Sequence, residues 1–244
     1  TWQFEVCNVM RLLNDTEYVE VEYSQVFFYE YDPRPSGCLS GEFGDPHVRT
    51  FDRLDFDCQA AGEFVMATSL EDPMFQIQER FTAIDSLSNC SQVSVSTGVA
   101  IRDTNMPTVQ ISTPRNNQTS LNMIDLWDAN GLTQCPVDFY VDGAAKTLDE
   151  DLSQYPNLAV SRLGIHRIRV VHLDTYVSAE IRVQYSNTFG CHFFVQTFLP
   201  EAYRPGETVV GLLGTCNADR SDDWRASDGA ILPVPTRVEE KLFS

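Results

Sequence analysis

The sequence predicts an all-β protein, and three observations carry that prediction. Apolar and polar residues alternate with a period of two in several stretches, most clearly over 177–185 and 93–101, as in half-buried strands. The dipeptide Asp142-Gly143 follows an apolar run over 139–141, which is typical of a type I′ β-hairpin. Helical periodicity is nearly absent, and the best helix candidate is the short stretch 237–243.

The same alternation marks further strands over 75–81 and 19–23. An aromatic strand over 26–31 is followed by a stretch with two prolines and a glycine, residues 32–37, which is typical of a domain boundary. We therefore expect three parts, in this order: a lead-in segment over 1–37, compatible with the end of a preceding module; a main domain over 38–235; and a tail or the start of a continuation over 236–244.

Charge narrows the classes of partner. The chain has 17 Lys and Arg against 35 Asp and Glu, a net charge of −18. Such a surface repels nucleic-acid phosphates and anionic membranes and attracts cations. No apolar run approaches the roughly 18 residues that a membrane helix needs. We therefore expect no nucleic-acid partner and no membrane span.

Cysteine spacing and sequons favour a secreted glycoprotein. The seven cysteines are dispersed without a CxxC pair, which fits disulfides in an oxidising compartment better than a zinc site. Seven is odd, so at least one cysteine is free, bonded to another chain, or bonded beyond an end of this one. Glycosylation sequons begin at Asn14, Asn89 and Asn117. We expect an extracellular or cell-surface location.

One loop has the composition of a calcium site. Residues 217–228 contain six oxygen-bearing side chains: Asn217, Asp219, Ser221, Asp222, Asp223 and Asp228. Calcium takes six to eight oxygen ligands, and a short acidic loop can supply several. An EF-hand is excluded, because the sixth position is Asp222 instead of glycine and neither flank is helical. A polar surface turn that binds nothing is the alternative.

Two motifs together resemble the von Willebrand factor type D domain. The first is GDPHVRTFD at 44–52 with QAAGEF at 59–64, and the second is GLLGTCNADRSDDW at 211–224. The resemblance covers about 38–235 and implies a twisted antiparallel β-sandwich with a loop-rich calcium site. It also implies a calcium ion held between the first strand and the late loop. The implied ligands are the side chains of Asp45, Asn217, Asp222 and Asp223, the backbone carbonyl of Asp219, and Thr215, which replaces the family's usual asparagine with a weaker donor.

Cysteine positions depart from the family pattern. Leu213 and Phe64 stand where the animal domains have cysteine, and Cys58 and Cys216 stand where the family has aromatic residues. Both lost aromatic side chains would lie near the calcium loop. The resemblance therefore suggests a disulfide between Cys58 and Cys216.

The family context implies a structural role instead of an enzymatic one. We expect a calcium-binding assembly module of a secreted matrix, filament, mucus-like or adhesive glycoprotein. Its partners would be other copies or other extracellular matrix proteins, within a larger polymer or multidomain chain. The sequence has no recognisable catalytic motif, and its four histidines are isolated.

Two alternatives have a basis in the same family. The bond between Asp45 and Pro46 belongs to an FGDPH-type motif that cleaves itself in some mucins and repulsive guidance molecules, with His47 as a local acid. Some marine luciferases also contain type D domains, so a part in a secreted enzyme is conceivable by analogy.

Overall fold

The computed structural model describes residues 3–5, 10–14, 17–20, 27–29, 37–43, 46–71, 75–84, 93–114, 120–128, 131–204, 208–224 and 231. The chain divides into two compact units, residues 1–35 and 36–244. This division lies two residues before the boundary that the proline-rich stretch predicts. The predicted helix over 237–243 lies outside the described residues.

The first unit contains two antiparallel strand pairs. Strand β1 (Gln3–Glu5) pairs with β4 (Phe27–Tyr29), and β2 (Met10–Asn14) pairs with β3 (Glu17–Glu20). Strand β3 overlaps the stretch over 19–23 where alternation predicts a strand, and β4 lies within the aromatic stretch over 26–31 that also predicts one.

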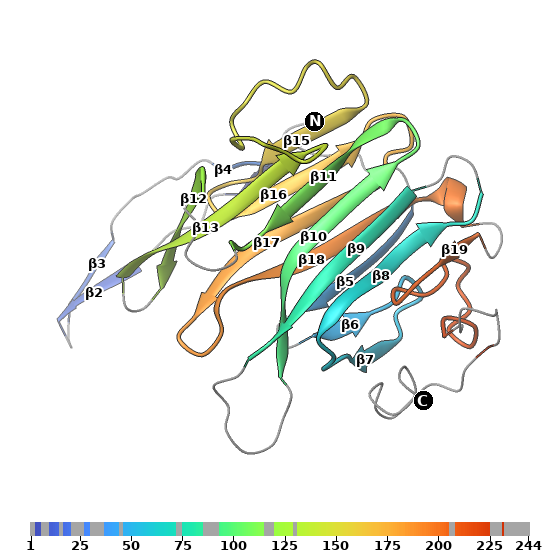
Figure 1. Cartoon of the computed structure of the whole chain (residues 1–244). Helices are drawn as coiled ribbons and strands as arrows, with labels where there is room; N and C mark the ends of the chain where they lie inside the picture. Colours follow the sequence, from blue (N-terminus) through green and yellow to red (C-terminus); the bar gives the residue numbers. More distant parts are fainter. Residues whose placement is uncertain are drawn as a thin grey trace. The chain divides into compact units, whose positions relative to one another are not determined.

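The second unit confirms the all-β prediction (Figure 1). Its regular elements, within the described residues, are strands and one short 3-10 helix, η1 (Glu201–Tyr203). The strands are β5 (Gly37–Phe43), β6 (His47–Arg49), β7 (Asp55–Asp57), β8 (Gly62–Ser69), β9 (Phe75–Ala83), β10 (Ser94–Asp103), β11 (Met106–Ser112), β12 (Asn122–Asp128), β13 (Gly131–Val141), β14 (Ala144–Ala145), β15 (Leu158–Arg162), β16 (Arg167–His172), β17 (Ser178–Ser186), β18 (Gly190–Pro200) and β19 (Val209–Val210).

The strands of this unit form two layers of one curled antiparallel sheet. One layer runs β8-β9-β10-β11-β13, and the other runs β5-β18-β17-β16-β15. Strand β10 joins the layers, because Ser96 pairs with Phe193 of β18. A disulfide between Cys135 of β13 and Cys191 of β18 also connects them. The result is a sandwich-like fold.

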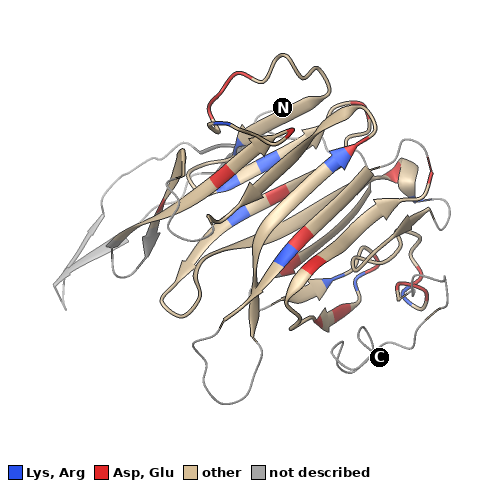
Figure 2. Ribbon diagram, viewed as in Figure 1, with Lys and Arg blue, Asp and Glu red and all other residues tan. Residues whose placement is uncertain are grey.

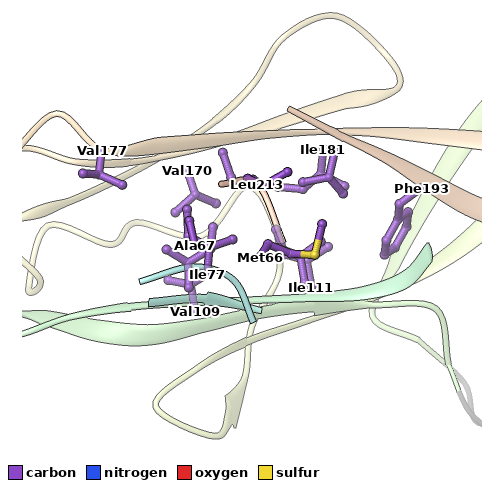
Figure 3. Packing of buried hydrophobic residues seen from close by; sticks show 14 of the residues in the cluster. Met66, Ala67, Ile77, Val109, Ile111, Val170, Val177, Ile181, Phe193 and Leu213 are labelled. Carbon is purple, nitrogen blue, oxygen red and sulfur yellow. The ribbon is translucent and has the colours of Figure 1, made fainter. Parts of the chain in front are cut away.

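The apolar core lies between these layers. Figure 3 shows Ile77, Val109 and Ile111 beside one ribbon layer, facing Val170 and Ile181 beside the other. Each of these side chains is fully buried, and in β9 and β16 the buried residues recur at every second position. The period of two in the sequence therefore reports the faces of real strands.

The predicted hairpin is confirmed in detail. Asp142 and Gly143 have φ values of 49° and 77°, which are the two positive angles of a type I′ turn. Val141 pairs with Ala144 across the turn. Asn-Gly and Asp-Gly favour this turn because both positions need left-handed backbone.

Within the described residues, no helix has the length and apolarity to span a membrane.

Candidate metal centre

The two motifs near the ends of the main domain lie far apart in sequence but meet in space. The Phe51 N–H donates to the Leu213 carbonyl at 2.9 Å, and the Arg220 Nε donates to the Asp52 carbonyl at 2.8 Å. The late loop is also tied to β8, because the Leu213 N–H donates to the Met66 carbonyl at 2.8 Å. Figure 1 shows the segment after β19 near β6 and β7. Segments more than 150 residues apart therefore form one site.

Three carboxylates gather at this junction. Asp52, Asp222 and Asp223 each offer an oxygen, and these oxygens lie within 4.8 Å of one another. Asp222 is 7% exposed and Asp223 is 4% exposed. Figure 2 shows acidic residues in the loop after β19 and in the neighbouring β7 strand. Three acids this close, two of them buried, make a concentrated negative site.

Asp223 is held by both segments. Its Oδ2 accepts a hydrogen bond from the Thr50 hydroxyl at 2.7 Å, and its Oδ1 accepts one from the Thr215 N–H at 3.1 Å. Gly214 makes this approach possible, because a Cβ at that position would overlap the Asp223 carboxylate. Its φ of 72° is also left-handed backbone, which favours glycine.

Asp52 and Asp222 hold the loop from its other side. The two Asp52 oxygens accept from the backbone N–H groups of Asn217 and Ala218, at 3.2 and 2.9 Å. The two Asp222 oxygens accept from the Thr215 hydroxyl at 3.0 Å and from the Asn217 amide at 2.9 Å. The loop thus wraps its donors around the carboxylates.

The electrostatics of the cluster favour a bound cation. The pKa of Asp223 is raised to about 6, mainly by burial; the negative charges of Asp52 and Asp222 add to the increase, and the hydrogen bonds from Thr50 and Thr215 oppose it. A divalent cation among these oxygens would remove the repulsion that raises this pKa. Carboxylate, amide and hydroxyl oxygens are hard donors, the type that calcium and magnesium prefer.

The structure brings some of the predicted ligands together and does not describe others. Asp222 and Asp223 lie together, and Thr215 and Asn217 contact Asp222 directly. The Asp219 side chain is exposed and accepts hydrogen bonds from Ser221 at 2.9 and 2.6 Å, which lower the pKa of its carboxyl. Whether the Asp219 carbonyl binds metal stays a prediction. Asp45 lies outside the described residues, as does Asp228 of the rejected EF-hand pattern.

Asp52 is the acidic member that the sequence reasoning missed. Asp52 is the last residue of the first motif, GDPHVRTFD. An acidic residue at that position was the one feature of the sequence that could have identified it as a member of the site. Its position in the site depends on hydrogen bonds to Asn217 and Ala218, which are 165 and 166 residues away. Thr50, two residues earlier, was missed for the same reason.

The predicted disulfide between Cys58 and Cys216 is wrong, because Cys216 is bonded to Cys38. The two α-carbons are 6.1 Å apart, within the range that a disulfide spans. Cys58 is buried in the same core, and its N–H donates to the Pro46 carbonyl at 2.8 Å. The differences from the family's cysteine pattern suggested that Cys58 and Cys216 lie near each other. They could not show that β5 brings Cys38 to Cys216.

The structure leaves the predicted glycosylation sites and the predicted cleavage at Asp45-Pro46 untested. Asn89 and Asn117 lie outside the described residues, and Asn14 is described only as the last residue of β2. His47, the suggested acid for cleavage at Asp45-Pro46, is exposed, and its Nδ1 lies 2.6 Å from Asp57 Oδ1. The two described disulfides are typical of extracellular or secreted proteins.

Comparison with known proteins shows a distant similarity to a longer human protein. No family model matches the chain. The chain is 26% identical over 202 residues to human Sushi domain-containing protein 2, an alignment that covers 83% of this chain. The chain spans 22% of the length of that relative, so the similarity concerns one part of the longer protein.

Proposed function

We propose that this chain is an extracellular, calcium-stabilised structural and assembly module of the von Willebrand type D kind. The observation that carries the proposal is the cluster of Asp52, Asp222 and Asp223, which unites two segments more than 160 residues apart. The Thr215 hydroxyl and the Asn217 side-chain amide lie beside them, and both donate to Asp222. Both segments belong to the motifs that carry the resemblance.

A cation at this site would act as a cross-link. The segment around Asp52 and the loop at 211–224 are far apart in the unfolded chain, so closing them costs conformational entropy. A ligand that binds the folded state alone stabilises it, by about 2.7 kcal/mol at a concentration 100 times its Kd. The same ion would offset the repulsion among the three carboxylates.

The geometry supports a structural use of these acids over a catalytic one. Each carboxylate accepts two or more hydrogen bonds from the loop or from Thr50. Side chains fixed in this way serve to bind an ion and hold two segments together. As a rigid module, the domain would contribute surfaces for assembly with other copies or with other extracellular proteins.

The test is a calorimetric titration of chelated protein with calcium and, separately, with magnesium. We expect one calcium ion per chain, bound more tightly than magnesium, and a higher melting temperature with calcium. Asp222→Asn should weaken calcium binding by at least about tenfold, because it removes a charged ligand. Asp174→Asn, in the exposed turn before β17, is the matched control and should bind as the unaltered protein does. A titration without binding heat, together with an unchanged melting temperature, would refute the proposal.

A further inference from the structure

A pocket of about 360 Å³ lies at one end of the sandwich. Its walls are the turn after β10 with the start of β11, the hairpin turn after β13, and the loop at 154–157. Two of these walls are joined, because Asn157 Nδ2 donates to the Asn105 carbonyl at 3.2 Å. Binding residues are disproportionately found on loops that a rigid scaffold positions, and this volume is within the range of ligand pockets. The pocket shares no residue with the candidate metal centre.

The pocket lining offers polar groups that the fold itself does not use. Asp142 Oδ1 accepts from the Thr108 N–H at 2.8 Å, and the Asp142 N–H donates to the Thr108 carbonyl at 2.8 Å. These bonds fix the carboxylate, whose Oδ2 accepts no hydrogen bond from the described residues. The side-chain amides of Asn105 and Gln154, which also line the pocket, make none with the described residues either. A ligand would therefore meet one oriented carboxylate oxygen and two amides.

Tyr155 supplies an aromatic wall to the same pocket. It is half-buried and packs against the apolar core. Its backbone is also fixed, because its N–H donates to the Leu152 carbonyl at 2.8 Å and its carbonyl accepts from the Leu158 N–H at 3.0 Å. The ring is thus part of a rigid wall beside the polar groups.

A second tyrosine, Tyr176, lies on the neighbouring turn between β16 and β17. This turn touches the pocket wall, because the Leu173 N–H donates to the Asn157 carbonyl at 2.9 Å. Tyr176 is 55% exposed and has a φ of 59°. Left-handed backbone is unusual for a bulky residue and indicates strain. Strained residues cluster at binding and active sites, so an exposed ring in this conformation points to a ligand.

A buried acid–base pair holds the strained turn from inside. Asp103 Oδ2, at the end of β10, lies 3.0 Å from His172 Nδ1, and the two side chains are 1% and 2% exposed. The Thr175 hydroxyl contacts both groups and also accepts from the Val177 N–H at 3.4 Å. The Tyr176 N–H donates to the His172 carbonyl at 2.8 Å. The turn is therefore fixed before a ligand arrives, which lowers the entropy cost of binding.

These features fit a neutral carbohydrate better than other small ligands. Each sugar hydroxyl both donates and accepts, so it can pair with an amide and with a carboxylate oxygen. The apolar C–H face of a sugar ring can pack on a tyrosine ring. An anionic ligand would be repelled by Asp142 and by the net charge of −18, and none of the described residues that line the pocket is Lys or Arg. An apolar ligand would desolvate the amides without giving them hydrogen bonds.

We propose that this end of the sandwich is a binding site for neutral oligosaccharides. Asn105, Asp142 and Gln154 hydrogen-bond the sugar hydroxyls, and Tyr155 and Tyr176 pack against the sugar rings. The site goes beyond the calcium-stabilised role proposed above, since it would attach the module to glycans on neighbouring extracellular molecules. It uses none of the residues of the candidate metal centre, so either proposal can fail without the other.

The experiment presents the wild-type chain, with calcium throughout, to an array of neutral, sialylated and sulfated oligosaccharides. The neutral oligosaccharide that binds most tightly is then titrated calorimetrically into the wild type and its variants. Gln154→Ala and Tyr176→Gly should each weaken binding at least about fivefold, because each removes a direct contact. Ile165→Ala is the matched control and should bind as the wild type does. Ile165 is 54% exposed in the turn between β15 and β16, at the opposite end of these strands.

The choice of variants keeps a folding defect from being mistaken for lost binding. Glycine suits a φ of 59°, so Tyr176→Gly should keep the wild-type melting temperature while it loses affinity. Gln154 is exposed, so its truncation should leave the melting temperature unchanged. An array without a bound neutral oligosaccharide, or with only sialylated or sulfated ones bound, would overturn the proposal. Equal affinities in the wild type, Gln154→Ala and Tyr176→Gly would overturn it as well.

Discussion

At the scale of single residues, the candidate metal centre depends on how closely the late loop approaches Asp223. Gly214 has left-handed backbone, and any Cβ there would overlap the Asp223 side chain. Thr50 contributes a hydroxyl that donates to Asp223 and also accepts from the Leu54 N–H at 2.8 Å. Small residues and hydroxyl groups around the acids are therefore as important to the geometry as the acids themselves.

Gly214→Ala should consequently damage both folding and metal binding. Gly143→Ala is a matched control, because Gly143 also has a positive φ, 77°, but has open space around its Cβ position. Both substitutions carry the left-handed strain of about 1–2 kcal/mol. The contact with Asp223 should make Gly214→Ala about 1–3 kcal/mol more destabilising still, as measured by urea unfolding. Equal losses in the two variants would show that the approach to Asp223 is unimportant.

The sequence predicts individual site residues where a short segment has an unusual composition. Asp222 and Asp223 were predicted from a dense acidic loop, and both lie in the cluster. Asp52 was missed, because its place depends on a loop that is remote in sequence.

At the scale of elements, the late loop is positioned by several attachments. Leu212 and Leu213 donate to carbonyls of β8, and Phe56 packs edge-on against Trp224 with ring centroids 4.6 Å apart. The Cys38–Cys216 disulfide adds a covalent attachment to β5. The loop therefore has a defined conformation although it contains no regular element between β19 and residue 224.

Loss of this disulfide should be costly. Its cysteines are 178 residues apart in sequence, and a loop of that length corresponds to about 5 kcal/mol of stabilisation in the chain-entropy model. Cys38→Ala combined with Cys216→Ala should therefore lower the unfolding free energy by several kcal/mol. Peptide mapping without reduction should recover Cys38 joined to Cys216. Recovery of Cys216 joined to Cys58 would contradict the connectivity seen in the structure.

Strand positions were predictable from the sequence, whereas strand partners were not. Alternation located β9, β10 and β17, and the Asp142-Gly143 turn located the end of β13. The pairing of β5 with β18 joins residues about 155 positions apart, and nothing local specifies it. The wrong disulfide has the same origin, because the choice between Cys38 and Cys58 depends on that pairing.

At the scale of the whole molecule, the candidate metal centre should make the stability of the fold depend on pH. Protons compete with calcium for the oxygens of the metal centre, so acid should weaken any clamp there.

The most direct test of the calcium clamp is hydrogen–deuterium exchange with and without calcium at pH 7.5. Calcium should slow exchange together in 47–58 and 211–224, because one ion would fix both segments. Strands β15 and β16, which lie in the other part of the sandwich, should change little and provide the internal control. Protection of the late loop alone, or of neither segment, would contradict the claim that an ion joins the two motifs.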